Sequence, residues 1–119
     1  MKINVFDETT AGGKDAGPVI EFALPKITVR TLIETRIRAE IDEQTGQMRS
    51  LRALVMPEHS TIGRKVDVKK QIDTAMRAFE AGSLLVLLPD RQADRLDETL
   101  TLEDGDEVSF LRLVPLIGG

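Results

Sequence analysis

The sequence predicts one α+β domain, in which a mixed sheet of four to five strands carries a helix across one face. Three observations lead to this fold class. Two strand-like segments open the chain, two segments with helical periodicity follow, and strand-like segments return near its end. The 119 residues suffice for one domain with a modest core. Apolar residues at 41% and charged residues at 30% are the proportions of a globular protein.

The first two strands are predicted to form a hairpin. Residues 2–6 alternate between two faces and place Ile3 and Val5 on the same one. Residues 9–18 contain three glycines and predict a long, flexible loop. Residues 19–24, which Pro25 closes, form the second strand.

Two amphipathic helices follow the hairpin. Thr28 is placed as the N-cap of the first helix, which Gly46 ends. Asp67 caps the second helix, and Gly82 stands at its C-terminal cap. The apolar stripes expected to face the sheet are Val29, Leu32, Ile33, Ile37 and Ile41 in the first helix, and Val68, Ile72, Ala75, Met76 and Phe79 in the second.

The segment between the helices is the hardest to interpret. Residues 51–56 have the composition of a short strand, and residues 57–64 that of a loop. His59 is the only histidine, and the chain has no cysteine. Because the local spacing offers no carboxylates to complete a metal site, we interpret His59 as a solvated loop residue. We expect no metal site and no intrinsic catalysis, since no carboxylate pair or Ser–His spacing emerges.

The C-terminal third completes the predicted sheet. Residues 84–88 form a continuous apolar run, typical of a strand buried on both faces. Residues 103–106 predict a tight turn in which Gly105 takes positive φ. Residues 108–113 form the last strand, whose apolar character favours a central position beside the first. This element order is that of a β-grasp fold with an extra helix inserted before the third main strand.

Charge and composition exclude several functions. The net charge of −4 gives no electrostatic support to nucleic-acid binding. No apolar run reaches the roughly 18 residues of a membrane span, and residues 1–10 do not resemble a signal peptide. We therefore expect a cytoplasmic protein that binds neither nucleic acid nor membrane. Aromatic residues make up only 3%, so we expect aliphatic interfaces.

The C-terminal third resembles ubiquitin-like proteins. The resemblance rests on three features: the apolar run at 84–88 followed by Pro89-Asp90-Arg91-Gln92, the segment Leu100-Thr101-Leu102 leading to Asp104-Gly105-Asp106-Glu107-Val108, and the ending FLRLVPLIGG over residues 110–119. The acidic turn, proline and terminal Gly-Gly are typical of the prokaryotic sulfur carriers of molybdopterin and thiamine synthesis. Leu111-Arg112-Leu113 is more similar to ubiquitin itself. The chain most resembles bacterial ubiquitin-like modifiers, although it is longer than ubiquitin and carries an extra helix.

This resemblance implies a function for the end of the chain. Residues 1–113 would form the ubiquitin-like β-grasp domain and residues 114–119 a flexible tail. An activating enzyme, using ATP and magnesium, would adenylate the Gly119 carboxylate. A conjugating enzyme would then pass it to an amine of a target protein, and an isopeptidase would reverse the step. The chain itself would bind no cofactor and would be a substrate rather than an enzyme.

The residue types of the tail suit this chemistry. Gly118 and Gly119 add no side-chain bulk near the reacting carbonyl and reach backbone conformations closed to other residues. Pro115 stiffens the tether. The residues expected to contact partners are Arg112, Leu113, Val114, Pro115, Leu116 and Ile117.

Two alternatives share these features. The chain can be a sulfur carrier that holds a thiocarboxylate at Gly119 for cofactor synthesis. It can also be a non-covalent interaction module, because a fold alone does not fix a function. The sheet is expected to expose an aliphatic patch that includes Leu111 or Leu113, unless these side chains belong to the core.

Overall fold

The computed structural model describes residues 1–54 and 67–113, and the side chains of residues 1–42 and 67–113. The strands are β1 (Lys2–Thr9), β2 (Lys14–Glu21), β3 (Lys26–Thr28), β4 (Leu84–Leu87), β5 (Thr99–Thr101) and β6 (Glu107–Arg112), and the helices are α1 (Val29–Leu54) and α2 (Val68–Ala81). The predictions for residues 55–66, including the loop with His59, lie outside the described residues, as does the tail 114–119.

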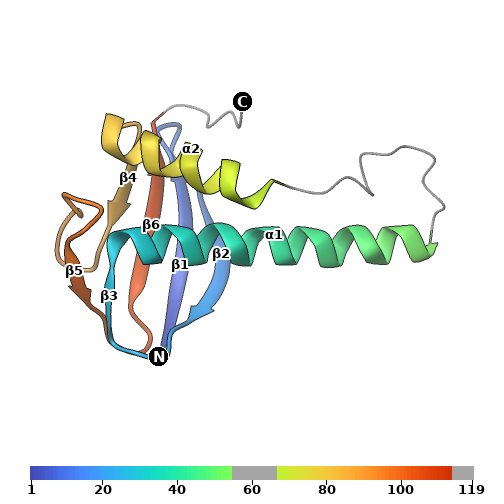
Figure 1. The fold of residues 1–119 in the computed structure, drawn as a ribbon, viewed down its shortest axis with the longest axis horizontal. Helices are drawn as coiled ribbons and strands as arrows, with labels where there is room; N and C mark the ends of the chain where they lie inside the picture. Colours follow the sequence, from blue (N-terminus) through green and yellow to red (C-terminus); the bar gives the residue numbers. More distant parts are fainter. Residues whose placement is uncertain (55–66, 114–119) are drawn as a thin grey trace.

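Four strands form a mixed sheet in the order β2-β1-β6-β4. β1 pairs antiparallel with β2 and parallel with β6, and β6 pairs antiparallel with β4. The last strand therefore lies centrally beside the first, as its apolar sequence predicts (Figure 1). The predicted α+β class and mixed sheet are confirmed, and the order of the strands is compatible with a β-grasp fold.

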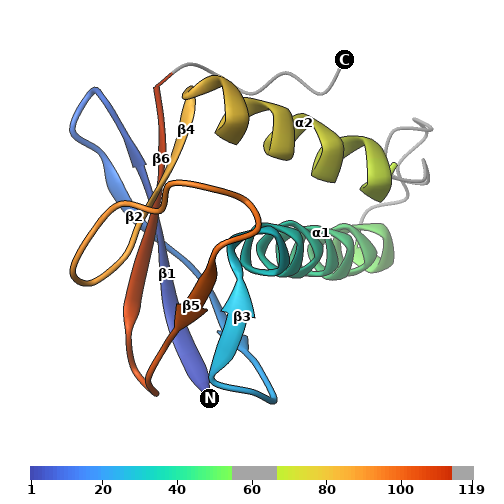
Figure 2. The ribbon, with the colours of Figure 1, turned by 60° about the vertical axis from the view of Figure 1, so that its left-hand side comes forward.

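Both helices lie on the same side of this sheet (Figure 2). α1 crosses the sheet and extends past β2, and α2 packs against α1 and β4. The extra helix predicted before the third main strand is thus present as α2. β3 and β5 form a separate two-stranded sheet that the sequence patterns did not predict as such.

The predicted caps and turn are confirmed. The Thr28 hydroxyl oxygen accepts a hydrogen bond from the Thr31 amide at 3.1 Å, and the Asp67 carboxylate accepts one from the Lys70 amide at 3.0 Å. Gly82 ends α2 in the left-handed region, with φ of 82°. Gly105 also has positive φ, at 88°, in the turn before β6.

The predicted long hairpin loop is wrong. β2 begins at Lys14 rather than at residue 19, so the connection from β1 is a short turn around Gly12, whose φ is 94°. Gly and Pro in this segment suggested a loop, but β2 is an edge strand, where a proline is tolerated because one side of the strand faces no partner. The pairing with β1 shifts register between Asn4 and Phe6, close to Gly17 and Pro18.

The predicted end of the first helix at Gly46 and the short strand at 51–56 are also wrong. α1 continues without interruption to Leu54. A glycine inside a helix costs only about 1 kcal/mol relative to alanine, which is too little to end it without a capping motif. No proline occurs between Gly46 and Pro57, so nothing in the backbone chemistry stops the helix earlier.

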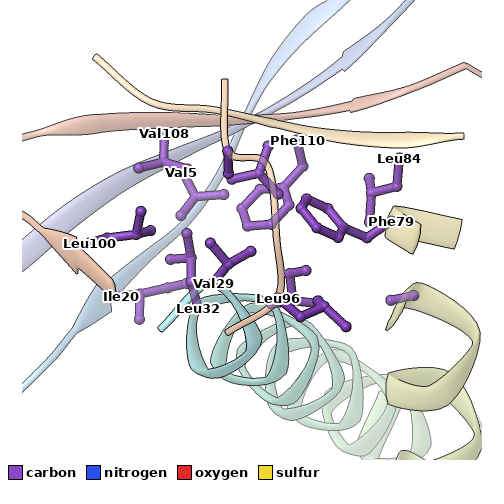
Figure 3. Packing of buried hydrophobic residues seen from close by; sticks show 14 of the residues in the cluster. Val5, Ile20, Val29, Leu32, Phe79, Leu84, Leu96, Leu100, Val108 and Phe110 are labelled. Carbon is purple, nitrogen blue, oxygen red and sulfur yellow. The ribbon is translucent and has the colours of Figure 1, made fainter. Parts of the chain in front are cut away.

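The core lies between the helices and the sheet. Figure 3 shows Val5 and Val108 of the sheet facing Val29 and Leu32 of α1, all of them at most 1% exposed. The other members of this cluster that Figure 3 labels are Ile20, Phe79, Leu84, Leu96, Leu100 and Phe110. The helices bury most of their apolar stripes as predicted, although Ile37, Val68 and Ile72 are only half-buried.

β4 differs from its predicted burial on both faces. Leu84 and Val86 point into the core, but Leu85 and Leu87 are only half-buried on the opposite face. The helices cover one face of the sheet and leave the other uncovered, which explains the alternation (Figure 2). Among the helices of residues 1–54 and 67–113, neither is apolar over a length that would cross a bilayer.

One charged residue is buried between α1 and the sheet. The side chain of Arg36 is 8% exposed, and its guanidinium contacts the carboxylates of Asp7 at 2.5 Å and Glu40 at 2.9 Å. It also lies over the Phe110 ring, 5.9 Å from the centroid. Its Nε has no hydrogen-bond partner in the described part of the chain. The Arg36–Asp7 pair therefore joins α1 to β1 within an otherwise apolar layer.

Candidate functional site

The end of β6 is where the described fold presents the C-terminal segment. Arg112, an exposed residue, stands opposite Thr9 of β1 on one side and Leu84 of β4 on the other. The next residue, Leu113, donates its backbone N–H to the Ser83 carbonyl at 2.9 Å. The chain is thus held between two neighbouring strands up to residue 113.

The turn from α2 to β4 positions the Ser83 carbonyl. The Gly82 amide donates to the Phe79 carbonyl at 3.1 Å, and the Ser83 amide donates to the Ala78 carbonyl at 2.9 Å. These two bonds form a Schellman motif, which requires the left-handed conformation of Gly82. A helix end and a central strand therefore meet where the tail begins (Figure 1).

The uncovered face of the sheet carries a second feature, here called the outer patch, which consists of Phe6, Leu85, Leu87 and Leu111 around Ser109. Their positions follow from the register, which pairs Ser109 with Phe6 and Leu87, and Leu111 with Leu85. Paired residues point to the same side of a sheet. The four apolar side chains are half-buried, and Ser109 is 8% exposed.

Polar and charged residues border the outer patch. The Lys14 ammonium lies over the Phe6 ring, 4.7 Å from the centroid. Glu8 stands opposite both Lys14 and Leu111 in the register. Val19 belongs to the same face but is paired with Asn4, further along the strands, and is 60% exposed. The patch is therefore a bounded apolar surface that begins near the C-terminal end of β6.

Of the predicted site residues, only the first two lie in the described part of the chain. Arg112 ends β6, and Leu113 follows it with 40% of its surface exposed. Val114, Pro115, Leu116, Ile117, Gly118 and Gly119 lie outside the described residues. Neither Leu111 nor Leu113 belongs to the buried core: Leu113 is exposed, and Leu111 is half-buried on the uncovered face.

Sequence reasoning missed the other members of the outer patch. Leu85 and Leu87 were assigned to a doubly buried strand because a continuous apolar run does not show which face is covered. Phe6 was placed on the face opposite Ile3 and Val5, and that alternation was the signal that could have identified it.

The described residues contain no cluster of three or more histidines, aspartates or glutamates with the spacing of a metal site. Comparison with models of protein families, with curated proteins and with solved structures found no match.

Proposed function

We propose that this chain is a ubiquitin-like β-grasp protein whose Gly119 carboxylate, where Gly119 forms the C-terminus, is adenylated by an activating enzyme and then transferred to amines of target proteins. The residue-level basis is the combination of a Gly-Gly ending with a preceding central strand. Such a strand gives a rigid base from which a short tail reaches a partner's active site.

The position of β6 carries this proposal. β6 lies between β1 and β4, and the Leu113 amide donates to the Ser83 carbonyl, so the sheet holds the backbone up to the residue before the tail. The six residues from 114 to 119 span about 20 Å when extended, at roughly 3.3–3.6 Å per residue. That length carries a carboxylate from a domain surface into an enclosed site.

The chemistry requires activation by a partner. A carboxylate is a poor electrophile because its charge repels nucleophiles and its leaving group would be oxide. Transfer of AMP from ATP to the carboxylate forms an acyl-adenylate and releases pyrophosphate. Attack by an amine or thiol then forms the new acyl bond and releases AMP. Because this chain has no cysteine, every thioester thiol belongs to a partner.

The outer patch supports a docking role beside this chemistry. It is a bounded apolar surface on the uncovered sheet face, and Leu111 within it stands two residues before Leu113. Partner recognition by this surface would place the tail at the partner's active site, since Leu111 of the patch lies in β6, the strand that the tail follows in the sequence.

A sulfur carrier is the second candidate, favoured by the acidic turn that ends at Asp106. Asp104 accepts a hydrogen bond from the Lys2 amide at 2.7 Å, and the Gly105 amide donates to the Lys2 carbonyl at 2.8 Å. This turn, typical of the sulfur carriers, fixes the start of β6 against β1. The chemical fate of the Gly119 carboxylate distinguishes this candidate from the protein modifier.

Mass spectrometry of the protein recovered from its host distinguishes the candidates. A Gly119 remnant on lysine of another protein supports conjugation, and replacement of one terminal oxygen by sulfur supports the carrier. In parallel, the cognate activating enzyme with ATP and magnesium should release pyrophosphate with the full chain. Deletion of Gly119 should abolish this release; unchanged release would refute the proposed role of the tail.

A further inference from the structure

One edge of β5 has no partner strand among residues 1–54 and 67–113, where β5 pairs only with β3. The Leu102 amide donates to the Pro25 carbonyl, and the Val29 amide donates to the Glu98 carbonyl. In an antiparallel pair, hydrogen-bonded and non-hydrogen-bonded residues alternate, so these two bonds determine which residues of β5 bond to β3. Leu100 therefore forms a hydrogen-bonded pair with Ile27 of β3. Thr99 and Thr101 direct their N–H and C=O groups to the side away from β3.

The amide nitrogens of Thr99 and Thr101 have no hydrogen-bond partner among residues 1–54 and 67–113. Both side chains are exposed, and Leu100 between them is 2% exposed. An unpaired strand edge of this kind is a template on which another extended segment can pair.

A cleft of about 480 Å³ lies at this edge, within the range of ligand-binding sites. Thr99 and Thr101 line it together with the turn that follows β4. The Leu88 amide donates to the Arg91 carbonyl at 2.7 Å and closes that turn. The cleft thus has a strand edge and a hydrogen-bonded turn among its walls, and both are formed before any ligand binds.

The charges around the cleft are predominantly negative. Asp90, Glu103 and Asp106 line it, and none of them forms an ion pair with a residue in the described part of the chain. The Arg91 guanidinium, the cation among the lining residues, is held by Glu98 at 2.6 Å. The electrostatic field therefore favours a cationic occupant.

We propose that this cleft binds an extended segment of a partner protein that carries lysine or arginine side chains, and that the segment adds to β5 as a third strand of the small sheet. Backbone groups of Thr99 and Thr101 pair with the segment, and its cations approach Asp90, Glu103 and Asp106. This interaction is non-covalent and does not depend on Gly119, so it goes beyond the proposed function of the tail.

The test uses the full chain and a blocked five-residue peptide in which lysine and valine alternate, acetyl-KVKVK-amide. Titration followed by ¹H–¹⁵N NMR should shift the amides of Thr99 and Thr101 and slow their hydrogen exchange. An acetyl-EVEVE-amide peptide should not bind. Raising the salt concentration should weaken binding of the lysine peptide, because exposed charge pairs are screened.

Two variants test the two parts of the site separately. Thr101→Pro removes an N–H that faces away from β3, so the pairing of β3 with β5 is retained while binding weakens about tenfold. The Asp90→Lys, Glu103→Lys double variant should also weaken binding about tenfold. Glu80→Lys, a reversal at an exposed position of α2, is the matched control and should leave binding unchanged.

Failure of the lysine peptide to shift these amides at millimolar concentration would overturn the proposal. So would equal binding by T101P and the original chain, because the contact would then be electrostatic attraction without strand addition. Protection of the Leu100 and Ile27 amides from hydrogen exchange in T101P, as in the original chain, shows that the small sheet is intact. Activation at Gly119, measured on the same variants, should be unaffected.

Discussion

Glu98 is a nearly buried carboxylate that accepts three hydrogen bonds. They come from the Arg91 guanidinium at 2.6 Å and from the backbone amides of Asp94 and Arg95 at 3.0 and 3.2 Å. The bond from Arg91 is the main reason that the pKa of Glu98 is lowered below its usual 4.5, and the two backbone bonds act in the same direction. Burial opposes them by penalising the charged form.

We therefore expect Glu98 to stabilise the fold above its ordinary pKa and to lose that contribution as the pH falls. The lowered pKa means that the unfolded chain takes up a proton first, so the stabilisation decreases from about pH 4.5 downward through the folded-state value. Glu98→Gln should lower the free energy of unfolding at pH 7 by about 1 kcal/mol. The difference in unfolding free energy between E98Q and the original chain should shrink as the pH falls below about 4.5.

Urea denaturation between pH 7 and pH 3 measures this difference. Glu80→Gln, at an exposed position, is the control and should change stability little at any pH. A difference between E98Q and the original chain that stays constant down to pH 3 would show that geometry, not charge, gives Glu98 its effect.

Arg36 shows what a sequence pattern cannot reveal about a single residue. It lies three residues after Ile33 and four after Leu32, on the apolar side of α1, so helical periodicity alone would place it toward the sheet. Its partner Asp7 lies 29 positions earlier in the chain. Only the docking of α1 on β1 brings the two charges together, and no local signal predicts that contact.

At the scale of elements, the end of α2 is set by Gly82. Its φ of 82° lies in the left-handed region, yet a Cβ added there would meet nothing within 4 Å. The cost of a substitution is therefore conformational and not steric. Gly82→Ala should lower the free energy of unfolding by about 1 kcal/mol, because L-residues with a Cβ disfavour this region.

Gly82→Asn is the matched variant for this prediction and should cost less, since asparagine tolerates left-handed φ. Both are measured by urea denaturation. The amide of Leu113 reports on the local effect, because it donates to the Ser83 carbonyl in the same turn and should exchange faster in G82A. Equal stability of G82A and the original chain would contradict this account of the turn.

Elements were predictable where local chemistry decides them and not where pairing does. Asp67 and Gly82 marked the ends of α2 because caps are local. The start of β2 at Lys14 was not predictable, since its glycines and proline are tolerated only through pairing with β1 at an edge. β3 and β5 have three residues each and are defined by each other across more than 70 positions of the chain.

At the scale of the whole molecule, one strand connects the core, the outer patch and the tail. Phe110 of β6 is buried beneath the helices, and the next residue, Leu111, belongs to the outer patch on the opposite face of the sheet. The sequence predicted that the last strand is central, and its place between β1 and β4 confirms this. It predicted an aliphatic patch near Leu111 but not the other members of that patch, because these come from neighbouring strands whose order only the folded sheet determines.

This arrangement predicts separate effects on folding and on recognition. Leu111→Arg places a charge on the uncovered face, so the chain should remain folded, with a melting temperature within a few degrees of the original. Its kcat/KM for adenylation by the cognate activating enzyme should fall at least about tenfold, as for a central interface residue. Val19→Arg is the matched control, because Val19 lies on the same face but is 60% exposed and is not part of the patch.

Pyrophosphate release measures the reaction, and saturation with the protein separates docking from chemistry. If the patch acts in docking, L111R should raise KM and leave kcat nearly unchanged, because the tail and its carboxylate are intact. An equal loss in L111R and V19R would indicate a general electrostatic effect of the added charge. An unchanged KM in L111R would show that the outer patch does not take part in docking to the activating enzyme.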